Sequence, residues 1–391
     1  MSLGAGRKQA LVEKTVRSLM QRSGLALALS ALVLPTPVGA ESLRDALAAA
    51  YMYSPKLDAE RARLRATDEN VTRAESGYRP IVEGSADFGR QTADSKPETE
   101  TNGEAAPWGY SISVRQSVFN GFRTTNEVSE AEASVRAGRE DLRLAETNAL
   151  LDAVGAYMDV VATQAIVRIR ENNVAALTEE LESAKTRRAA KEVTRTDVAQ
   201  AQARLARANS TADLAKSDLK TARALYMRVI GHAPGKLMLP PMSMSKLPRS
   251  IEEAWEMGEQ YNPTVGSALY REEAARFAVD KVRGELLPEV NIEASYGYRE
   301  NLNAYYKEQD GASITARASI PFYDGGETRA RVRQAKEIHV SLLQEIEQAR
   351  ADTQASVTAA WSALMGQRAK LKSDQVQVEA NRIALEGVRE E

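Results

Sequence analysis

The stretch SISVRQSVFNG (111–121) returns later in the chain as SITARASIPFYDG (313–325). Both stretches alternate polar and apolar residues and end in Asn-Gly or Asp-Gly, dipeptides that are typical of turns. The surrounding residues repeat as well, with each pair 208 positions apart: Ser42 and Ser250, Pro80 and Pro288, Phe88 and Tyr296. This period is too long for a solenoid unit and predicts a duplicated half-molecule.

The composition favours long helices over one bulky core. The chain has 391 residues, of which 43% are hydrophobic and only 5% are aromatic. The formal net charge is −2, so no basic excess indicates nucleic acid as a partner. Cysteine is absent, which excludes disulfides, thiol nucleophiles, cysteine metal sites and a lipid-bearing N-terminal cysteine.

Residues 1–40 have the pattern of a secretory signal peptide. Basic residues precede the apolar run LALALSALVL (25–34), and Val38-Gly39-Ala40 forms a small-residue cleavage site before Glu41. Translation from Met20 would give a signal of more ordinary length. The alternative is an anchor retained in the inner membrane. After Ala40 we expect no helix long and apolar enough to span a membrane, so a membrane-spanning mature protein would need strands.

Each copy is predicted to contain helices, a pair of strands and a long helix. The first structural repeat, 41–235, has a two-part helix over 42–77, strands at 80–91 and 108–119, a long helix at 123–188 and a helix at 195–230. A Pro-rich linker, 236–249, joins it to the second repeat. The second repeat, 250–391, has strands at 288–299 and 312–322 and a long helix from about 326.

The long helix at 123–188 is predicted to have neighbours on two sides. At 1.5 Å per residue it would be about 100 Å long, far beyond an ordinary globular helix. Its apolar residues form two heptad stripes on different faces, whereas a dimeric coiled coil needs one. The stripes are Val128, Val135, Leu142, Ala149 and Ala156, and Leu144, Leu151, Met158 and Ala165. This pattern indicates a cylinder of helices.

The four predicted strands alternate like those of an outer-membrane barrel, with an apolar face toward lipid and a polar face toward a lumen. The predicted lipid-facing residues are Phe88, Trp108, Tyr110, Ile112, Tyr296, Tyr298 and Ile314. The predicted barrel lumen residues are Glu83, Asp87, Arg115, Glu293 and Arg317. The alternative is a sheet half-buried on a soluble core.

Four strands cannot close a barrel, so the chain must oligomerise. Two copies would supply eight strands, whose side chains fill the bore. Three copies would supply twelve, so a water-filled duct favours at least three copies.

Several motifs resemble those of TolC-like outer-membrane efflux proteins, which are also known as outer membrane factors. They are SVRQSVFNGF (113–122), ASIPFYDGG (318–326) and VTRTDVAQAQARLARA (193–208), in an order that covers most of 42–391. Ser117 stands where the family commonly has proline, and Lys191 where its helical hairpins usually have glycine.

The resemblance implies a mainly α fold with a membrane β-barrel segment, assembled as a homotrimeric duct through the outer membrane and the periplasm. The duct would be the passive exit of a multidrug efflux or type I secretion system. Its partners would be a periplasmic adaptor (membrane fusion) protein, an inner-membrane RND or ABC pump, and outer-membrane lipid.

The resemblance also implies a role for Asp197 in the gate at the periplasmic end, with an arginine of the second copy as its partner. A simpler interpretation is that Thr194 or Thr196 caps the helix and Asp197 favours its N-terminus. The first copy's residues 188–235 have no counterpart in the second copy, so we expect the natural protein, or the family pattern, to continue beyond Glu391.

No catalytic, nucleotide-binding, cofactor or metal-binding motif occurs in the chain. His232 and His339 are the only histidines, and we expect them to be solvated surface residues. Two alternatives to the duct stay open at this point: a periplasm-spanning structural coiled-coil protein without a pore, and a soluble helical enzyme.

Overall fold

The computed structural model describes residues 41–94, 96, 102–241, 247–303, 305 and 307–390. The predicted signal peptide, with Met20, therefore lies outside the described residues, as do parts of the first strand-connecting loop and of the Pro-rich linker. The chain forms two compact units. One contains 41–46, 157–227 and 232–240, and the other contains 47–156, 228–231 and the described residues from 241 onward.

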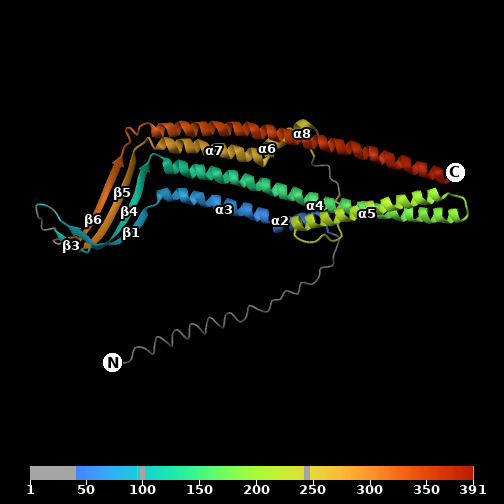
Figure 1. Cartoon of the computed structure of the whole chain (residues 1–391). Helices are drawn as coiled ribbons and strands as arrows, with labels where there is room; N and C mark the ends of the chain where they lie inside the picture. The colour runs from blue at the N-terminus through green and yellow to red at the C-terminus, as the bar shows by residue number, and fades with distance from the viewer. Residues whose placement is uncertain are drawn as a thin grey trace, which may run out of the picture. The chain divides into compact units, whose positions relative to one another are not determined.

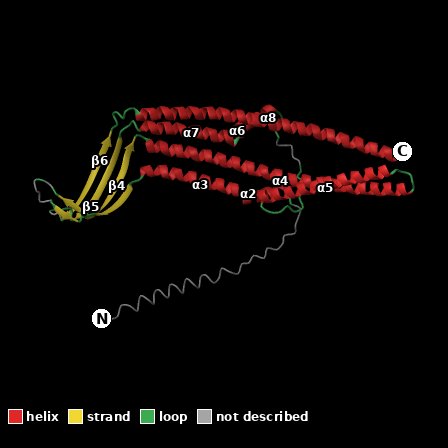
Figure 2. Cartoon of the chain, in the orientation of Figure 1, coloured by secondary structure: helices red, strands yellow, loops and turns green. Residues whose placement is uncertain are grey.

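The larger unit contains a sheet built from both copies of the repeat. Strands β1 (Ile81–Phe88) and β4 (Trp108–Asn120) come from the first copy, and β5 (Glu289–Glu300) and β6 (Glu308–Ser319) from the second. The order is β1-β4-β5-β6 with antiparallel pairing throughout, and β4 and β5 join the two copies (Figure 2). In the described part of the chain, β1 and β6 are the edges of this sheet.

Two strand boundaries differ from those expected. The strand expected at 80–91 ends at Phe88, and Gln91–Ala93 (β2) instead pairs with Gly103–Ala105 (β3) in a small ladder. The strand expected at 312–322 runs from Glu308 to Ser319, because pairing with β5 extends as far as Glu300 opposite Glu308. Pro321 follows soon after the end of β6, and proline has no N–H to donate to a ladder.

The same strand-to-helix turn occurs in both copies. It needs two consecutive residues in the left-handed region, Gly121 (φ 67°) and Phe122 (φ 62°) in the first copy and Gly325 (φ 71°) and Gly326 (φ 91°) in the second. Left-handed backbone is strained for residues with a Cβ, so glycine fits this turn best.

The residue before each turn caps the helix that follows. Asn120 donates to Thr124 Oγ1 at 2.6 Å, and its own oxygen lies 3.5 Å from the Thr124 N–H. Asp324 accepts from the N–H groups of Gly326 and Thr328 at 2.9 and 2.8 Å. The long helices α4 (Arg123–Ala189) and α8 (Glu327–Glu390) thus begin in the same way.

The short helices of the larger unit come in pairs that are split at a proline. Helix α2 (Leu43–Tyr53) precedes α3 (Pro55–Glu75), and α6 (Ile251–Tyr261) precedes α7 (Pro263–Gly284). As expected for Ser54, its hydroxyl accepts from Leu57 N–H, and Asn262 caps α7 in the same manner. Proline suits the first helical position, where its missing N–H has no helical partner. Helices α7 and α8 run side by side (Figure 1).

The helix packing depends on small side chains. In the larger unit Ala133 and Ala153 of α4 are fully buried, as is Leu57 of α3. Of the two predicted stripes, Val135 and Ala156 are buried in this unit, whereas Leu151 is 66% exposed. Asp141 of α4 ties this helix to α7 through Ser267 (2.7 Å) and Arg271 (2.8 Å).

The smaller unit pairs the second part of α4 with α5 (Arg195–Ile230). Arg204 lies 3.1 Å from Glu180 and Lys216 lies 3.3 Å from Glu171 across the pair. The connecting turn places Lys191 at φ 65°, a conformation that suits the glycine usual in the resembling family. Alanines of α5 are buried at helical spacing: Ala201, Ala208, Ala212, Ala215 and Ala222.

Two buried tyrosines hold Glu41 in this unit. Glu41 forms a parallel bridge with Leu237, and the Tyr157 hydroxyl lies 2.9 Å from Glu41 O and 2.6 Å from Met238 O. Tyr226 donates to Glu41 Oε1 at 2.7 Å. Burial and the neighbouring carboxylate raise the pKa of Tyr226, so this phenol stays protonated as a donor.

One expectation about membrane helices was wrong. Among the described residues, α4 contains an 18-residue stretch that is long and apolar enough to cross a membrane, of which 28% is buried. The stretch is apolar because α4 is rich in alanine and valine. These residues also form its helix-packing faces, for example at Ala153, Ala156 and Val160.

We expect Gly121→Ala to destabilise the protein much more than Gly325→Ala. Both changes place a Cβ on left-handed backbone, which costs about 1–2 kcal/mol. At Gly121 the new Cβ would also collide with the carbonyl of Gly284, whereas at Gly325 no described atom lies within 4 Å. Thermal unfolding followed by circular dichroism measures the difference. Equal losses in the two variants would show that the Gly121–Gly284 contact does not matter.

The Asp324 cap should make the stability of α8 dependent on acid. Hydrogen bonds from Thr328 and Gly326 lower the pKa of Asp324 to about 2. In the unfolded chain the pKa of an aspartate is about 3.9. The stabilisation of the folded state by the ionised Asp324 is therefore complete above about pH 3.9 and is lost as the pH falls toward 2. Asn caps as well as Asp but does not titrate. We therefore expect the thermal unfolding midpoint of the wild type to fall between pH 5 and pH 2 by several degrees more than that of Asp324→Asn. Parallel pH profiles for the two proteins would contradict this.

Candidate functional site

The strand register gives the sheet one polar face and one apolar face. On the polar face Glu83, Ser113, Ser295 and Ser313 form one cross-strand row, and Arg115 lies opposite Glu293 in another. All of the residues predicted to line a lumen lie on this face: Glu83, Asp87, Arg115, Glu293 and Arg317.

The middle of the polar face is mainly serine, with Glu83 as a charge on β1, and the other charges lie toward the two ends. Ser85 is hydrogen-bonded to Ser111 at 2.8 Å, and Ser295 to Ser313 at 2.9 Å. Toward the end far from the helices, Asp87 lies 3.8 Å from Arg299. Charges of both signs also lie toward the helix end. The polar face can therefore be hydrated along its whole length, and it is neither uniformly positive nor uniformly negative.

The apolar face carries an aromatic cluster at the end far from the helices. The Trp108 and Tyr298 rings lie 5.7 Å apart, and Tyr110 stacks on Tyr298 at 5.6 Å. The residues predicted to face lipid share this face: Phe88, Trp108, Tyr110, Ile112, Tyr296, Tyr298 and Ile314. Phe88 is 83% exposed and Ile314 is 82% exposed, so the face has no cover within one chain.

A second aromatic group, which was not predicted from the sequence, lies at the helix end of the sheet. Phe119 and Phe122 meet edge to face at 5.2 Å, and Phe322 is 91% exposed. Tyr323 is 85% exposed. The signal was present in the sequence, because both copies of the turn motif carry aromatic residues immediately before Asn-Gly or Asp-Gly.

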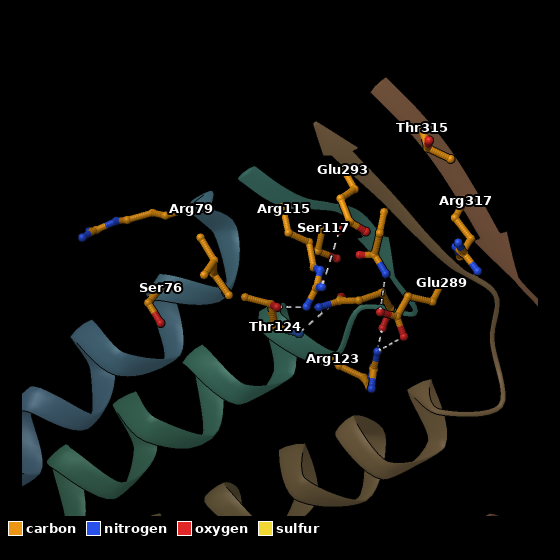
Figure 3. A pocket seen from close by; sticks show the side chains of 14 residues that line it. Ser76, Arg79, Arg115, Ser117, Arg123, Thr124, Glu289, Glu293, Thr315 and Arg317 are labelled. Atoms are coloured by element: carbon orange, nitrogen blue, oxygen red, sulfur yellow. Dashed lines mark hydrogen bonds and ion pairs between the residues drawn. The ribbon is translucent and has the colours of Figure 1, made fainter. Parts of the chain in front are cut away.

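A polar pocket of about 540 Å³ lies at the helix end of the polar face (Figure 3). Arg115 lies 3.8 Å from Glu293, and Arg123 lies 2.6 Å from Glu289. Arg115, Glu293 and Arg317 were predicted as separate lumen residues, but the sequence did not predict that they share a pocket. Arg123 was not predicted, and neither were the other polar lining residues, which are Ser76, Arg79, Ser117, Asn120, Thr124, Glu289, Asn291 and Thr315.

Asp197, the gate candidate, lies apart from the sheet at the start of α5. Its carboxylate accepts from the N–H and the hydroxyl of Thr194, each at 2.7 Å, and Thr194 Oγ1 accepts from Asp197 N–H at 3.2 Å. These bonds lower the pKa of Asp197. The reciprocal pattern is a capping box, as the simpler interpretation predicted with Thr194 as the cap.

Each histidine lies beside a single carboxylate. His232 is 3.5 Å from Glu41, and His339, with a side chain only 25% exposed, is hydrogen-bonded to Glu272. The expected solvated surface role therefore does not describe His339. No group of three or more metal-ligating side chains occurs among the described residues.

The sequence profile described as "Outer membrane efflux protein" matches residues 47–232 and 257–390. The chain belongs to this family. It is 37% identical over 355 residues to the outer membrane efflux protein BepC of Brucella suis biovar 1 (strain 1330), covering 90% of this chain and 76% of BepC.

Two solved structures have the same fold. The crystal structure of CusC matches with a TM-score of 0.77 at 13% identity, over 89% of this chain and 81% of CusC. The outer-membrane channel OprN matches with a TM-score of 0.73 at 22% identity, over 87% of this chain and 78% of OprN.

Family membership decides among the three interpretations of the sequence. This efflux protein is an outer-membrane channel that extends into the periplasm, and it is not an enzyme. The family implies trimeric assembly. The coiled-coil protein without a pore and the soluble helical enzyme are therefore excluded.

Proposed function

We propose that three copies of the chain close their sheets into one twelve-stranded barrel, which serves as the exit duct for substrates delivered from the inner membrane. A periplasmic adaptor would dock on the helices, and an RND or ABC pump would supply the energy. The chain contains no nucleotide-binding motif and so cannot power export itself.

The single observation that carries this proposal is a two-faced sheet with open edges. In lipid every backbone N–H and C=O needs a partner, and closed barrels satisfy this where open sheets do not. The edges β1 and β6 are free to pair with β6 and β1 of neighbouring copies.

In this arrangement the apolar face meets lipid and the polar face lines the lumen. Tyr110 and Phe119 mark the two aromatic groups on β4. Nine residues at about 3.4 Å each separate them by about 30 Å along the strand. At a tilt of about 40° this becomes about 23 Å, close to the apolar band of about 25 Å in outer-membrane barrels.

Arginine at neighbouring positions on β4 tests this assignment. Ile112 lies on the apolar face and Ser113 on the polar face. We expect Ile112→Arg to cost about 1–3 kcal/mol per chain and to reduce the amount of assembled trimer, because it places a charge on the lipid side of the barrel, inside the apolar band and two residues from its Tyr110 edge. Ser113→Arg should still assemble, because a twelve-stranded barrel holds water in its lumen.

Two measurements check this: the fraction of heat-modifiable trimer on gels of unheated outer membranes, and channel conductance in planar bilayers. A stable Ile112→Arg trimer together with an unstable Ser113→Arg protein would reverse the two faces. Purified wild-type trimers that form no channels would contradict the duct.

We further propose that Asp197 helps to hold the periplasmic end shut. Asp197→Ala should raise single-channel conductance severalfold, because it removes a carboxylate from the closing contacts. Thr194→Val is the matched control, since it loses the capping hydroxyl but keeps the carboxylate. An equal rise in both variants would show that loss of the cap, and not loss of the charge, opens the channel.

A further inference from the structure

We propose that the pocket at the helix end of the polar face is a binding site for organic anions on their way through the duct, with a carboxylate or sulfonate as the recognised group. This inference rests on the proposed function, because the pocket meets passing solutes only if the polar face lines the lumen. With three chains the duct would carry three such sites.

The charged side chains of the pocket leave one positive charge unbalanced. Arg115 is paired with Glu293, and Arg123 with Glu289. Arg317 reaches the pocket from β6, and no carboxylate of the described residues lies within 4.0 Å of its guanidinium. Arg79 also borders the pocket, but it points away from the other labelled side chains and lies 3.5 Å from Glu75, which balances its charge (Figure 3).

Ser117 adds an unused hydrogen-bonding group. Its hydroxyl oxygen is buried and has no hydrogen-bond partner among the described residues. It borders the pocket at the point where the pairing of β4 with β5 shifts register. The second copy has Pro321 at the equivalent place, so the turn itself does not need a hydroxyl here. Buried polar atoms without a partner are rare and call for an explanation, which a bound anion would supply.

The chemistry of the lining fits an oxyanion. A guanidinium presents paired N–H donors that match the two oxygens of a carboxylate or sulfonate, and such charge-assisted bonds are strong. Asn291 lies opposite Arg317 and Thr315 lies opposite Glu293. The Thr315 hydroxyl and the second N–H of the Asn291 amide, whose first N–H donates to Glu289, offer further donors. Helix α4 begins at Arg123 beside the pocket, and the partial positive charge of a helix N-terminus adds to the attraction.

The size of the pocket fits a small organic molecule better than an inorganic ion alone. About 540 Å³ lies within the range of 300–1,000 Å³ typical of ligand sites. The site would hold anions only briefly, because it is open to the lumen and its paired charged side chains, Arg115, Glu293, Arg123 and Glu289, are partly accessible to water. Such a site would favour organic anions over cations and neutral molecules in the duct.

The test uses the full-length trimer in planar bilayers, with naphthalenesulfonate as the probe and naphthol as its uncharged analogue. We expect naphthalenesulfonate, but not naphthol, to block the current with a measurable concentration dependence. Arg317→Gln should weaken the block about tenfold, the loss expected when one charge-assisted hydrogen bond is removed. Ser117→Ala should weaken it about threefold.

Arg299→Gln is the matched control, because it removes the same charge from the same face at the far end of the sheet. The naphthalenesulfonate concentration that blocks half of the current should stay within about twofold of the wild-type value. An equal effect of Arg299→Gln and Arg317→Gln would mean that only the overall charge matters and would overturn the site. No effect of Arg317→Gln would overturn it as well, since Arg317 would then be neutralised inside the trimer.

The two proposals fail in different ways. If the wild type conducts but naphthalenesulfonate does not block it, the anion site is wrong and the duct stands. If the wild type forms no channel, the proposed duct fails. If Arg317→Gln does not assemble, Ser117→Ala alone decides, because a block unchanged by that substitution contradicts the site.

Discussion

Inside a lipid bilayer no backbone N–H or C=O can be left without a hydrogen-bond partner, and the architecture of this efflux protein depends on that constraint. One chain builds a sheet whose two edge strands, β1 and β6, have one neighbour each. The apolar face of the sheet has no cover within the chain. The proposed twelve-stranded trimer would answer both demands, because it would pair the edges and leave the apolar face to the lipid.

Because the sequence is duplicated, the sheet and its helices are built from a few structural elements that each occur twice. Each copy contributes two strands, a split pair of short helices and one long helix. The same turn, with two left-handed residues and a capping side chain, connects strand to long helix in both copies. The copies differ where they meet, since Gly121 and Gly284 approach too closely for any Cβ, whereas Gly325 has open space around it. Within a single chain, therefore, one copy of the turn is tightly packed and the other lies at the open edge of the sheet after β6.

Much of this could be predicted from the sequence because the signals are local and periodic. Alternation along the strands placed the predicted lumen residues on one face and the predicted lipid residues on the other, and Thr194 was named among the candidate caps of the helix that contains Asp197. The failures concern pairing and packing. The sequence did not show that β6 would extend back to Glu308, because that end is set by pairing with β5. It also did not place His339 against Glu272, since these residues lie on different helices.

The sequence by itself determined the repeat, which is visible as similar stretches in the two copies. It also determined the two-residue alternation of the strands, the helical spacing of apolar residues, the capping residues and the polarity of each strand face, because each of these depends on residues close together in the chain. Only the tertiary structure decided which residues of different strands and helices meet. The pocket gathers Arg123 at the start of α4, Ser117 of β4, Glu289 of β5 and Arg317 of β6. Nothing in the spacing of these four residues along the chain indicates that they meet, because strand register and the β4 bulge set their distances. Local chemistry defined the parts of this efflux protein, and hydrogen bonding between distant strands decided where its charges gather.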